Sequence, residues 1–249
     1  MGRKKVEEVV VDPSAWMLAN AFAEFVLFHT DEIKYMCMLG YTFMHGSKVF
    51  AKLPAGAATT YKFVNLLLAS TGGGILVPIL INGIPVPLAQ DSYPIAILCS
   101  YLLHSYVPIV RDVFKLSKVF KAGVIILYET MRAFVVCKLT IAAGNAIAPS
   151  EFDFPIFGPI FCGTLAGCGG AFLPMNKGLD PIKAGLAQPM LSAFIGATSL
   201  HLFLNTSLSE GIIDGTKKAK VCMAAFFILH SYYENFFKPA PAADKKKTE

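Results

Sequence analysis

The chain consists of long apolar runs separated by short polar segments along nearly its whole length. An apolar stretch of about 20 residues can cross the hydrocarbon of a bilayer as a helix, because a helix satisfies its own backbone hydrogen bonds. The runs do not alternate between apolar and polar positions, so they do not indicate strands. We therefore predict an all-α membrane protein with seven transmembrane helices, of which the first could be two because charged residues interrupt it. The predicted spans are 16–53, 62–81, 93–110, 114–147, 154–173, 181–204 and 221–237.

Composition supports a membrane protein over a soluble enzyme. Of 249 residues, 55% are hydrophobic and only 16% are charged, and the mean hydropathy is +0.55, whereas soluble domains carry about 25% charged residues. The net charge is +5, but the basic residues lie between apolar runs and at the C-terminus. This distribution indicates membrane orientation and no nucleic-acid partner. The cysteines lack metal-ligand spacing and are predicted to be small buried thiols. They are Cys37, Cys99, Cys137, Cys162, Cys168 and Cys222.

The distribution of Lys and Arg predicts how the chain sits in the membrane. With seven spans, most basic residues near span ends fall on the side of the C-terminus, which is therefore predicted to be cytoplasmic, with the N-terminus lumenal. Lys217 and Lys218 lie on the other side and disagree. The N-x-[ST] sequon at Asn205 falls in a predicted lumenal loop. Lys246 and Lys247 resemble the dilysine retrieval signal of endoplasmic reticulum membrane proteins, and a solvated polar tail is the alternative.

An internal repeat relates the first three spans to the next three. Three short patterns recur in the same order at a nearly constant offset. A repeat unit with an odd number of spans inserts its second copy upside down, so we predict an inverted three-plus-three repeat followed by a seventh helix. The matched patterns are Gly73–Pro78 with Gly169–Pro174 (G-G-x-x-x-P), Leu103-His104 with Leu200-His201, and Asp31-x-x-Lys34 with Glu129-x-x-Arg132.

The repeat also sets the expected organisation of the chain into segments. Each half contributes three helices, and the remaining parts are terminal or connecting. The last helix lies outside the repeat and returns the chain to the cytoplasmic side. The predicted segments are a polar lumenal N-terminus (1–13), the first three-helix repeat (14–111), the second three-helix repeat (112–205), a loop with the seventh helix (206–237) and a cytoplasmic Lys-rich tail (238–249).

The duplicated glycines with a following proline predict helix breaks in the second and fifth spans. Glycine weakens a helix and proline removes a backbone donor, and in hydrocarbon the freed carbonyls need protein or water. Close packing of small residues is the alternative, but recurrence in both halves favours a pathway near the midplane. Cationic residues of the first and fourth spans are expected near it. The predicted pore residues are Lys34, Gly72, Gly73, Gly74, Pro78, Arg132, Gly169, Gly170 and Pro174.

Charged and polar residues inside the spans indicate further roles. Asp31 with Lys34, and Glu129 with Arg132, are each spaced to form an ion pair on one helix face. His104 and His201 are expected to form hydrogen bonds within the bundle rather than to bind metal. No protease or hydrolase motif is visible, so an enzyme is not predicted. One face of the fourth span combines cations with a phenol, which suits an anionic phospholipid headgroup. The predicted lipid-binding residues are Lys118, Lys121, Tyr128 and Arg132.

From about residue 16 to residue 237 the chain resembles the trimeric intracellular cation channels (TRIC) of the endoplasmic and sarcoplasmic reticulum. The span order, the glycine motifs, the segment 128–132 (YETMR) and the segment 167–170 (GCGG) carry the resemblance. It implies a homotrimer with an hourglass pore in each subunit, conducting mainly potassium as counter-current to calcium release. It also implies a phosphoinositide, held by the Lys and Arg of a Lys-Glu-Val-x-Arg motif. Here Glu129 and Arg132 match, Tyr128 and Thr130 depart from the motif, and Lys121 offers a charge on the same face.

The sequence therefore favours a potassium-permeable channel of the endoplasmic or sarcoplasmic reticulum membrane. A secondary transporter is the main alternative, because inverted repeats and broken helices are equally typical of transporters. A non-conducting membrane adaptor is a third possibility, but it leaves the duplicated helix breaks unexplained. No metal and no cofactor other than the lipid is predicted.

Overall fold

The computed structural model describes residues 12–54, 56–175 and 178–238, and within these ranges the secondary structure is helical, with no strand. The expected all-α fold is confirmed. The dilysine pattern, the rest of the C-terminal tail and residues 1–11 lie outside the described residues. The helices are η1 (Ala15–Met17), α1 (Ala21–Val26), α2 (Asp31–Phe50), α3 (Thr59–Leu80), α4 (Val86–Ala89), α5 (Ser92–Tyr106), α6 (Ile109–Leu116), α7 (Lys118–Ala146), α8 (Phe157–Cys168), η2 (Gly169–Ala171), η4 (Asp180–Ile182), α9 (Gln188–Asn205), η5 (Ser207–Ser209), α10 (Gly215–Tyr232) and η6 (Tyr233–Phe237).

The first predicted span is two helices in the structure, α1 and α2. The charged residues that interrupt it had left this alternative open. Phe28 between them has a φ of 58°, and the Thr30 side chain accepts a hydrogen bond from the amide of Ile33 and caps α2. Asp31 therefore stands in the first turn of α2, where the helix dipole favours a carboxylate. The expected ion pair between Asp31 and Lys34 is absent among the described residues, while the pair of Glu129 and Arg132 is present.

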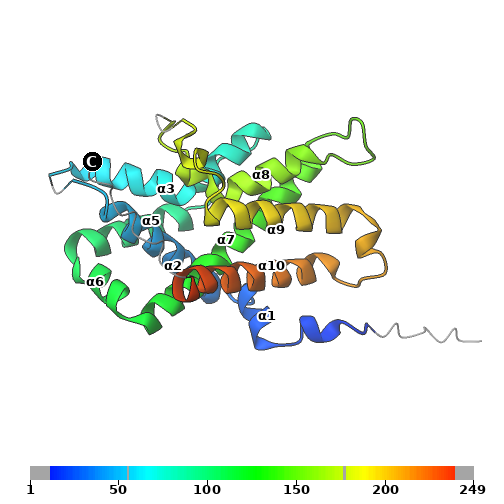
Figure 1. The fold of residues 1–249 in the computed structure, drawn as a ribbon, viewed down its shortest axis with the longest axis horizontal. Coiled ribbons are helices and arrows are strands. Elements are labelled where there is room, and N and C mark those ends of the chain that lie inside the picture. Colours follow the sequence, from blue (N-terminus) through cyan, green and yellow to red (C-terminus); the bar gives the residue numbers. More distant parts are fainter. Residues whose placement is uncertain (1–11, 55, 176–177, 239–249) are drawn as a thin grey trace, which may run out of the picture.

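The 29-residue helix α7 runs diagonally through the molecule and contacts α2, α8, α9 and α10 (Figure 1). Ser117 caps it, because its hydroxyl accepts a hydrogen bond from the amide of Phe120 at 3.2 Å. The fourth predicted span begins too early, at residue 114, since Phe114 belongs to the separate helix α6. The third span likewise ends at Tyr106, because Pro108 cannot continue α5 and the chain turns by 94° into α6.

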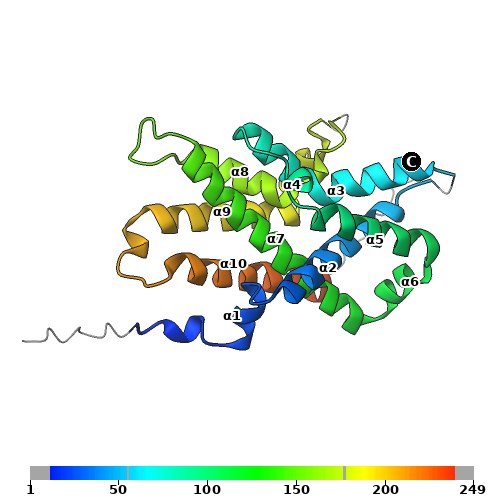
Figure 2. The same cartoon turned by 180° about the vertical axis from the view of Figure 1, so that it is seen from behind.

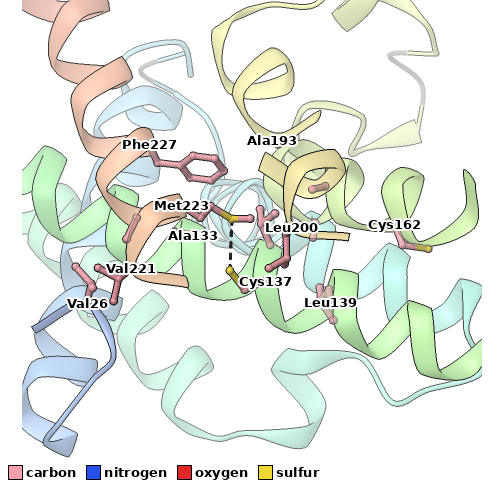
Figure 3. Close-up of a cluster of buried hydrophobic side chains, with 14 of the residues drawn as sticks. Val26, Ala133, Cys137, Leu139, Cys162, Ala193, Leu200, Val221, Met223 and Phe227 are labelled. Atoms are coloured by element: carbon pink, nitrogen blue, oxygen red, sulfur yellow. Dashed lines mark hydrogen bonds between the residues drawn. The ribbon is translucent and has the colours of Figure 1, made fainter. Parts of the chain in front are cut away.

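A buried apolar cluster joins α7, α9 and α10 (Figure 3). Phe227 and Met223 of α10 face Ala133 and Cys137 of α7, and the Cys137 and Met223 sulfur atoms are 3.4 Å apart. Small side chains at this junction let the helices approach closely. Seen from the opposite side, α8 and α9 lie at one end of α7 and α2 and α5 at the other (Figure 2).

The cysteines divide into two groups. All six are free thiols. Cys37, Cys137 and Cys162 are buried, as expected, and Cys168 is half-buried. The prediction of burial is wrong for Cys99 and Cys222, which lie exposed on the outer surfaces of α5 and α10. Apolar flanking residues predict that a cysteine lies in a membrane helix, but they do not predict whether it is on the buried face of that helix.

The two histidines of the repeat occupy similar structural settings. His104 Nε2 lies 3.1 Å from the carbonyl oxygen of Phe43, joining α5 to α2. His201 Nε2 lies 2.5 Å from the carbonyl oxygen of Pro155 and ties α9 to the loop before α8. The expectation that both form hydrogen bonds within the bundle is confirmed.

Among the described helices, α3 is long and apolar enough by itself to cross a membrane, and the bent pair α5 and α6 meets the same measure together. The other predicted spans are shorter, less apolar or more charged in the structure. α8, for example, has only 12 residues before the chain tightens into η2. The seven-span topology and the inverted repeat thus remain predictions.

Candidate functional site

A cavity of about 660 Å³ opens between α2, α3, α7, the α8–η2 junction and the start of α9. Its wall brings together polar groups from α2, small residues of both glycine motifs and the phenol of Tyr128. Basic side chains line it, but no Asp or Glu does so within the described part of the chain. The lining residues that bear on its chemistry are Tyr41, His45, Lys48, Lys52, Tyr61, Asn65, Gly72, Gly73, Tyr128, Gly167, Gly169 and Gly170.

The two glycine motifs meet backbone to backbone at the cavity wall. A Cβ atom built on Gly73 would stand 2.2 Å from the carbonyl oxygen of Ala166, and one on Gly170 would stand 2.1 Å from that of Ala69. These separations are too short for any side chain, so only glycine permits the contact. The repeat found in the sequence therefore corresponds to one close crossing between α3 and η2.

The expected break in the second span is wrong, because α3 continues through all three glycines and Pro78. Pro78 has no amide hydrogen to donate to the carbonyl oxygen of Gly74, but it stands in the last turn, so only Ile79 and Leu80 of α3 follow it. In the fifth span the helix does tighten at Gly169, where α8 ends and η2 begins. Intact helix packing thus accounts for Gly72 and Gly73, and a true interruption occurs only in the second half.

The predicted pore residues do not all reach this cavity. Gly72, Gly73, Gly169 and Gly170 line it. Gly74 packs instead under Val86, whose Cβ would be 3.2 Å from a Cβ at that position. Pro78, Pro174, Arg132 and Lys34 are not among the lining residues, and Lys34 lies half-buried near the start of α2, 5.9 Å from the centre of the Tyr35 ring.

An aromatic and cationic cluster forms another part of the cavity wall. The rings of Tyr41 and Tyr128 stack with centroids 5.1 Å apart and planes inclined by 11°. Lys48 Nζ lies 5.2 Å from the centre of the Tyr128 ring, a cation–π contact. His45 packs against both phenol rings, and its Nε2 is buried without a hydrogen-bond partner in the described structure. Within the described part of the chain, this cluster thus places at the cavity one lysine that forms no ion pair, Lys48, and one polar atom without a hydrogen bond, His45 Nε2.

Arg132 lies behind the cavity and binds protein groups with its guanidinium nitrogens. It forms an ion pair with Glu129 and a hydrogen bond with the hydroxyl of Ser192. Its Nε donates to the carbonyl oxygen of Gly167 at 3.3 Å, and Nη2 donates to that of Pro189 at 2.8 Å. The guanidinium carbon is 4.3 Å from the centre of the Phe227 ring. Arg132 thus ties α7 to α8, α9 and α10, and it holds Gly167 at the cavity wall.

Of the four predicted lipid-binding residues, only Tyr128 lines the cavity. Lys118 is exposed at the first residue of α7, and Lys121 Nζ lies 5.4 Å from the centre of the Phe236 ring. Lys48 and Lys52 line the cavity but are not among the site residues predicted from the sequence. The sequence holds a signal for this site, since Tyr41, His45 and Lys48 recur at helical spacing along one face of α2. Lys52 follows at the same spacing, just after the helix ends.

Comparison with solved structures identifies the fold. A structure of a trimeric intracellular cation channel from C. elegans in the absence of Ca²⁺ aligns with a TM-score of 0.66 at 16% identity, covering 90% of this chain and 97% of that one. A second structure, from work on conductance through TRIC cation channels, aligns with a TM-score of 0.62 at 16% identity, covering 85% of this chain and 96% of that one. No family model and no curated sequence matches the chain.

The chain therefore has an all-helical fold that solved ion-channel structures share. More specifically, its fold is that of the trimeric intracellular cation channels, as the sequence resemblance implied. The shared fold extends over 85–90% of this chain and 96–97% of the compared chains.

Proposed function

We propose that this protein is a monovalent cation channel that conducts mainly potassium. The observation that carries the proposal is the cavity that ends at the crossing of the two glycine motifs, in a chain with the TRIC fold. Small residues at the crossing leave backbone groups as the nearest polar atoms. The carbonyl oxygens of Ala69 and Ala166 contact the opposing glycines, so the backbones must separate before an ion can pass between them. Carbonyl oxygens exposed in this way are suitable ligands for a partly dehydrated cation.

The lysines of the cavity require a compensating anion in this proposal. Lys48 and Lys52 would repel a cation, and the described cavity wall provides no carboxylate. We propose that a phosphoinositide headgroup enters the cavity and neutralises them. The Tyr128 hydroxyl and the unpaired His45 Nε2 are additional polar contacts for phosphate oxygens. Lys118 and Lys121 would attract the lipid at the surface, and Arg132 would act from behind the wall by holding Gly167.

We further propose that the protein assembles as a homotrimer with one pore in each subunit, in the endoplasmic or sarcoplasmic reticulum membrane. There it would supply counter-ion current during calcium release. The fold of the compared channel, which is described as trimeric, supports the assembly. The Lys-rich tail and the distribution of basic residues support a cytoplasmic C-terminus. Chemical crosslinking of purified protein in mild detergent should stop at three subunits, and a product ending at two would contradict this assembly.

Single-channel recording tests the conduction. Purified full-length protein is reconstituted into a planar bilayer, and currents are first recorded across a potassium gradient. In a second recording, an impermeant organic cation replaces potassium. We expect unitary current steps that reverse near the potassium equilibrium potential and vanish when potassium is replaced. Solute uptake without unitary steps would indicate the secondary transporter instead. Neither uptake nor current from correctly assembled protein would indicate an adaptor.

A further inference from the structure

The short helix α6 lies at an outer corner of the molecule, between the predicted third and fourth spans (Figures 1 and 2). It follows α5 at an angle of 94°, with Pro108 at the turn. If α5 crosses the bilayer, α6 must run roughly along the bilayer surface. In the predicted topology that surface is the cytoplasmic one.

The inner side of α6 is fixed to the protein. Phe114 packs edge-on against Phe43 of α2, with ring centroids 5.7 Å apart. Arg111 Nη1 donates to the carbonyl oxygen of His104 at 2.5 Å, close to the C-terminal end of α5. This bond satisfies a carbonyl group near the end of α5 and holds the corner at its sharp angle. The position of α6 is therefore determined by the fold, and its outer face points in a defined direction.

The outer face of α6 is an exposed apolar stripe. Ile109, Val113 and Leu116 recur at helical spacing and are 64%, 46% and 83% exposed. Val119, at the start of α7, extends the stripe and is 84% exposed. A contiguous apolar stripe at a fixed angle to a membrane span is typical of helices that lie in the interface, with the apolar side among acyl chains.

The charges beside the stripe favour an anionic lipid surface over a second copy of the chain. Lys115 and Lys118 are exposed, and Asp112 is the single acidic residue of α6. Lys115 Nζ lies 4.0 Å from Asp112, but both side chains are 68% exposed, so this contact is weak. Two copies joined through this stripe would bring their basic flanks together. An anionic leaflet would attract the same flanks.

We propose that α6 is an interfacial anchor that inserts Ile109, Val113 and Leu116 into the cytoplasmic leaflet, while Lys115 and Lys118 contact anionic headgroups. The proposal depends on the chain lying in a membrane and not on its conducting ions. It assigns Lys118 to the general bilayer surface, whereas the cavity proposed above takes one specific headgroup. The anchor would hold the corner between α5 and α7 at a fixed depth in the bilayer.

Depth measurements on the full-length protein test the proposal. The accessible thiols Cys99, Cys168 and Cys222 are first replaced by serine, and a fluorophore is attached at Val113→Cys. Asp112→Cys is the matched control, because it is the adjacent residue and points about 100° away around the helix. In vesicles of phosphatidylcholine and phosphatidylserine with brominated acyl chains, we expect quenching at position 113 by the lipid. At position 112 we expect quenching by aqueous iodide instead.

Two other outcomes would overturn the proposal. Equal quenching of both positions by iodide would show that α6 lies in water. Protection of position 113 from both quenchers, with self-quenching that is lost on dilution with unlabelled protein, would show that a second copy covers the stripe. Size-exclusion profiles that match the unlabelled parent confirm that each variant is folded before it is tested.

The role of the lysines is tested in the same assay. Lys115→Gln with Lys118→Gln should reduce the lipid quenching at position 113 in phosphatidylserine vesicles to the level seen in pure phosphatidylcholine. Vesicles in which phosphoinositide replaces phosphatidylserine at equal charge should give the same loss. A loss confined to phosphoinositide would contradict the proposal and assign these lysines to a specific headgroup site.

Discussion

Gly72 of α3 lies against Gly170 of η2 so closely that a Cβ atom on Gly72 would stand 2.4 Å from the amide nitrogen of Gly170. The contact joins two segments nearly one hundred residues apart, since Gly72 immediately precedes the first copy of the repeated motif and Gly170 lies in the second. No flexible side chain lies between them, so an added carbon atom has to separate two backbones. The crossing is thus a rigid junction between the two halves of the chain.

The first prediction follows from this contact. Gly72→Ala should move α3 away from η2, lower the unfolding free energy by about 1–3 kcal/mol and reduce conduction. Thermal unfolding in detergent and single-channel recording measure the two effects. Gly123→Ala is the control, because that glycine in α7 has open space around its Cβ position, and its replacement should be neutral or stabilise by up to about 1 kcal/mol. Equal stability of the two variants would contradict the tight crossing.

The second prediction concerns the ion pair of Glu129 and Arg132, in which both side chains are fully buried. Arg132→Met should destabilise the protein by about 3–5 kcal/mol, because it leaves a buried carboxylate without its cation. The double variant with Glu129→Gln should recover part of this loss, since no uncompensated charge remains. The midpoint of chemical or thermal unfolding reports both changes. A double variant no more stable than Arg132→Met would show that the hydrogen bonds to α8 and α9 dominate instead.

The third prediction concerns the lipid in the cavity. Lys48→Met should weaken retention on phosphoinositide vesicles roughly fivefold, as expected for about 1 kcal/mol per lysine near anionic lipid. Tyr128→Lys should strengthen it, because a third lysine then faces the cavity beside Lys48 and Lys52. Lys62→Met is the control, since it removes the same charge from a nearby position that does not line the cavity. Equal weakening by Lys48→Met and Lys62→Met would indicate only a general surface attraction.

The fourth prediction concerns the attachment of the N-terminal segment to α10. Lys218 Nζ donates to Asp12 and to the Ser14 hydroxyl, each at 2.6 Å, and the lysine is buried. Lys218→Met should release this segment and speed amide hydrogen exchange around residues 12–18. Lys217→Met should have little effect, because its pair with Asp214 is exposed at 3.0 Å. Equal exchange in both variants would contradict the attachment.

The same pair predicts a pH dependence. The hydrogen bonds from Lys218 and Ser14 lower the pKa of Asp12 from 3.8 to about 2. A carboxyl group with a lowered pKa stabilises the folded state fully above its unfolded pKa, and this contribution is lost as the pH falls toward the folded value. The attachment should therefore be constant above about pH 4 and weaken between there and pH 2. Amide hydrogen exchange around residues 12–18, measured across this pH range, tests this. The Lys218→Met variant should lack the pH-dependent loss of protection.

Lys218 also explains why the distribution of basic residues gave a mixed signal. Counted along the sequence, it opposes the predicted orientation together with Lys217. In the structure its charge is paired with Asp12, which lies more than two hundred positions earlier in the chain. A rule that counts charges near span ends treats each lysine as free. The pairing removes Lys218 from that count, but no local pattern reveals it.

The sequence by itself determined the helical class, the approximate positions of the long helices and the two motifs that meet at the crossing. These properties follow from apolar run length, helix-breaking residues and repeated short patterns, which are local. Hydrogen bonding by His104 and His201, and the pairing of Glu129 with Arg132, were also predictable from the residue type and spacing. The TRIC resemblance was confirmed at the level of the fold.

Only the tertiary structure decided how these helices share their surfaces. It placed Lys48 of α2, and Lys52 just after that helix, at the cavity. It also turned Arg132 toward α8 and α9 and separated α6 from the neighbouring helices. It also showed that α3 is continuous through its glycines. Because these residues have no side chains, η2 can approach α3 closely while the helix stays unbroken. The physical reason is that the surroundings of each helix face depend on contacts with segments distant in the sequence. The periodicity of a helix's own sequence does not specify which neighbouring segment packs against each face.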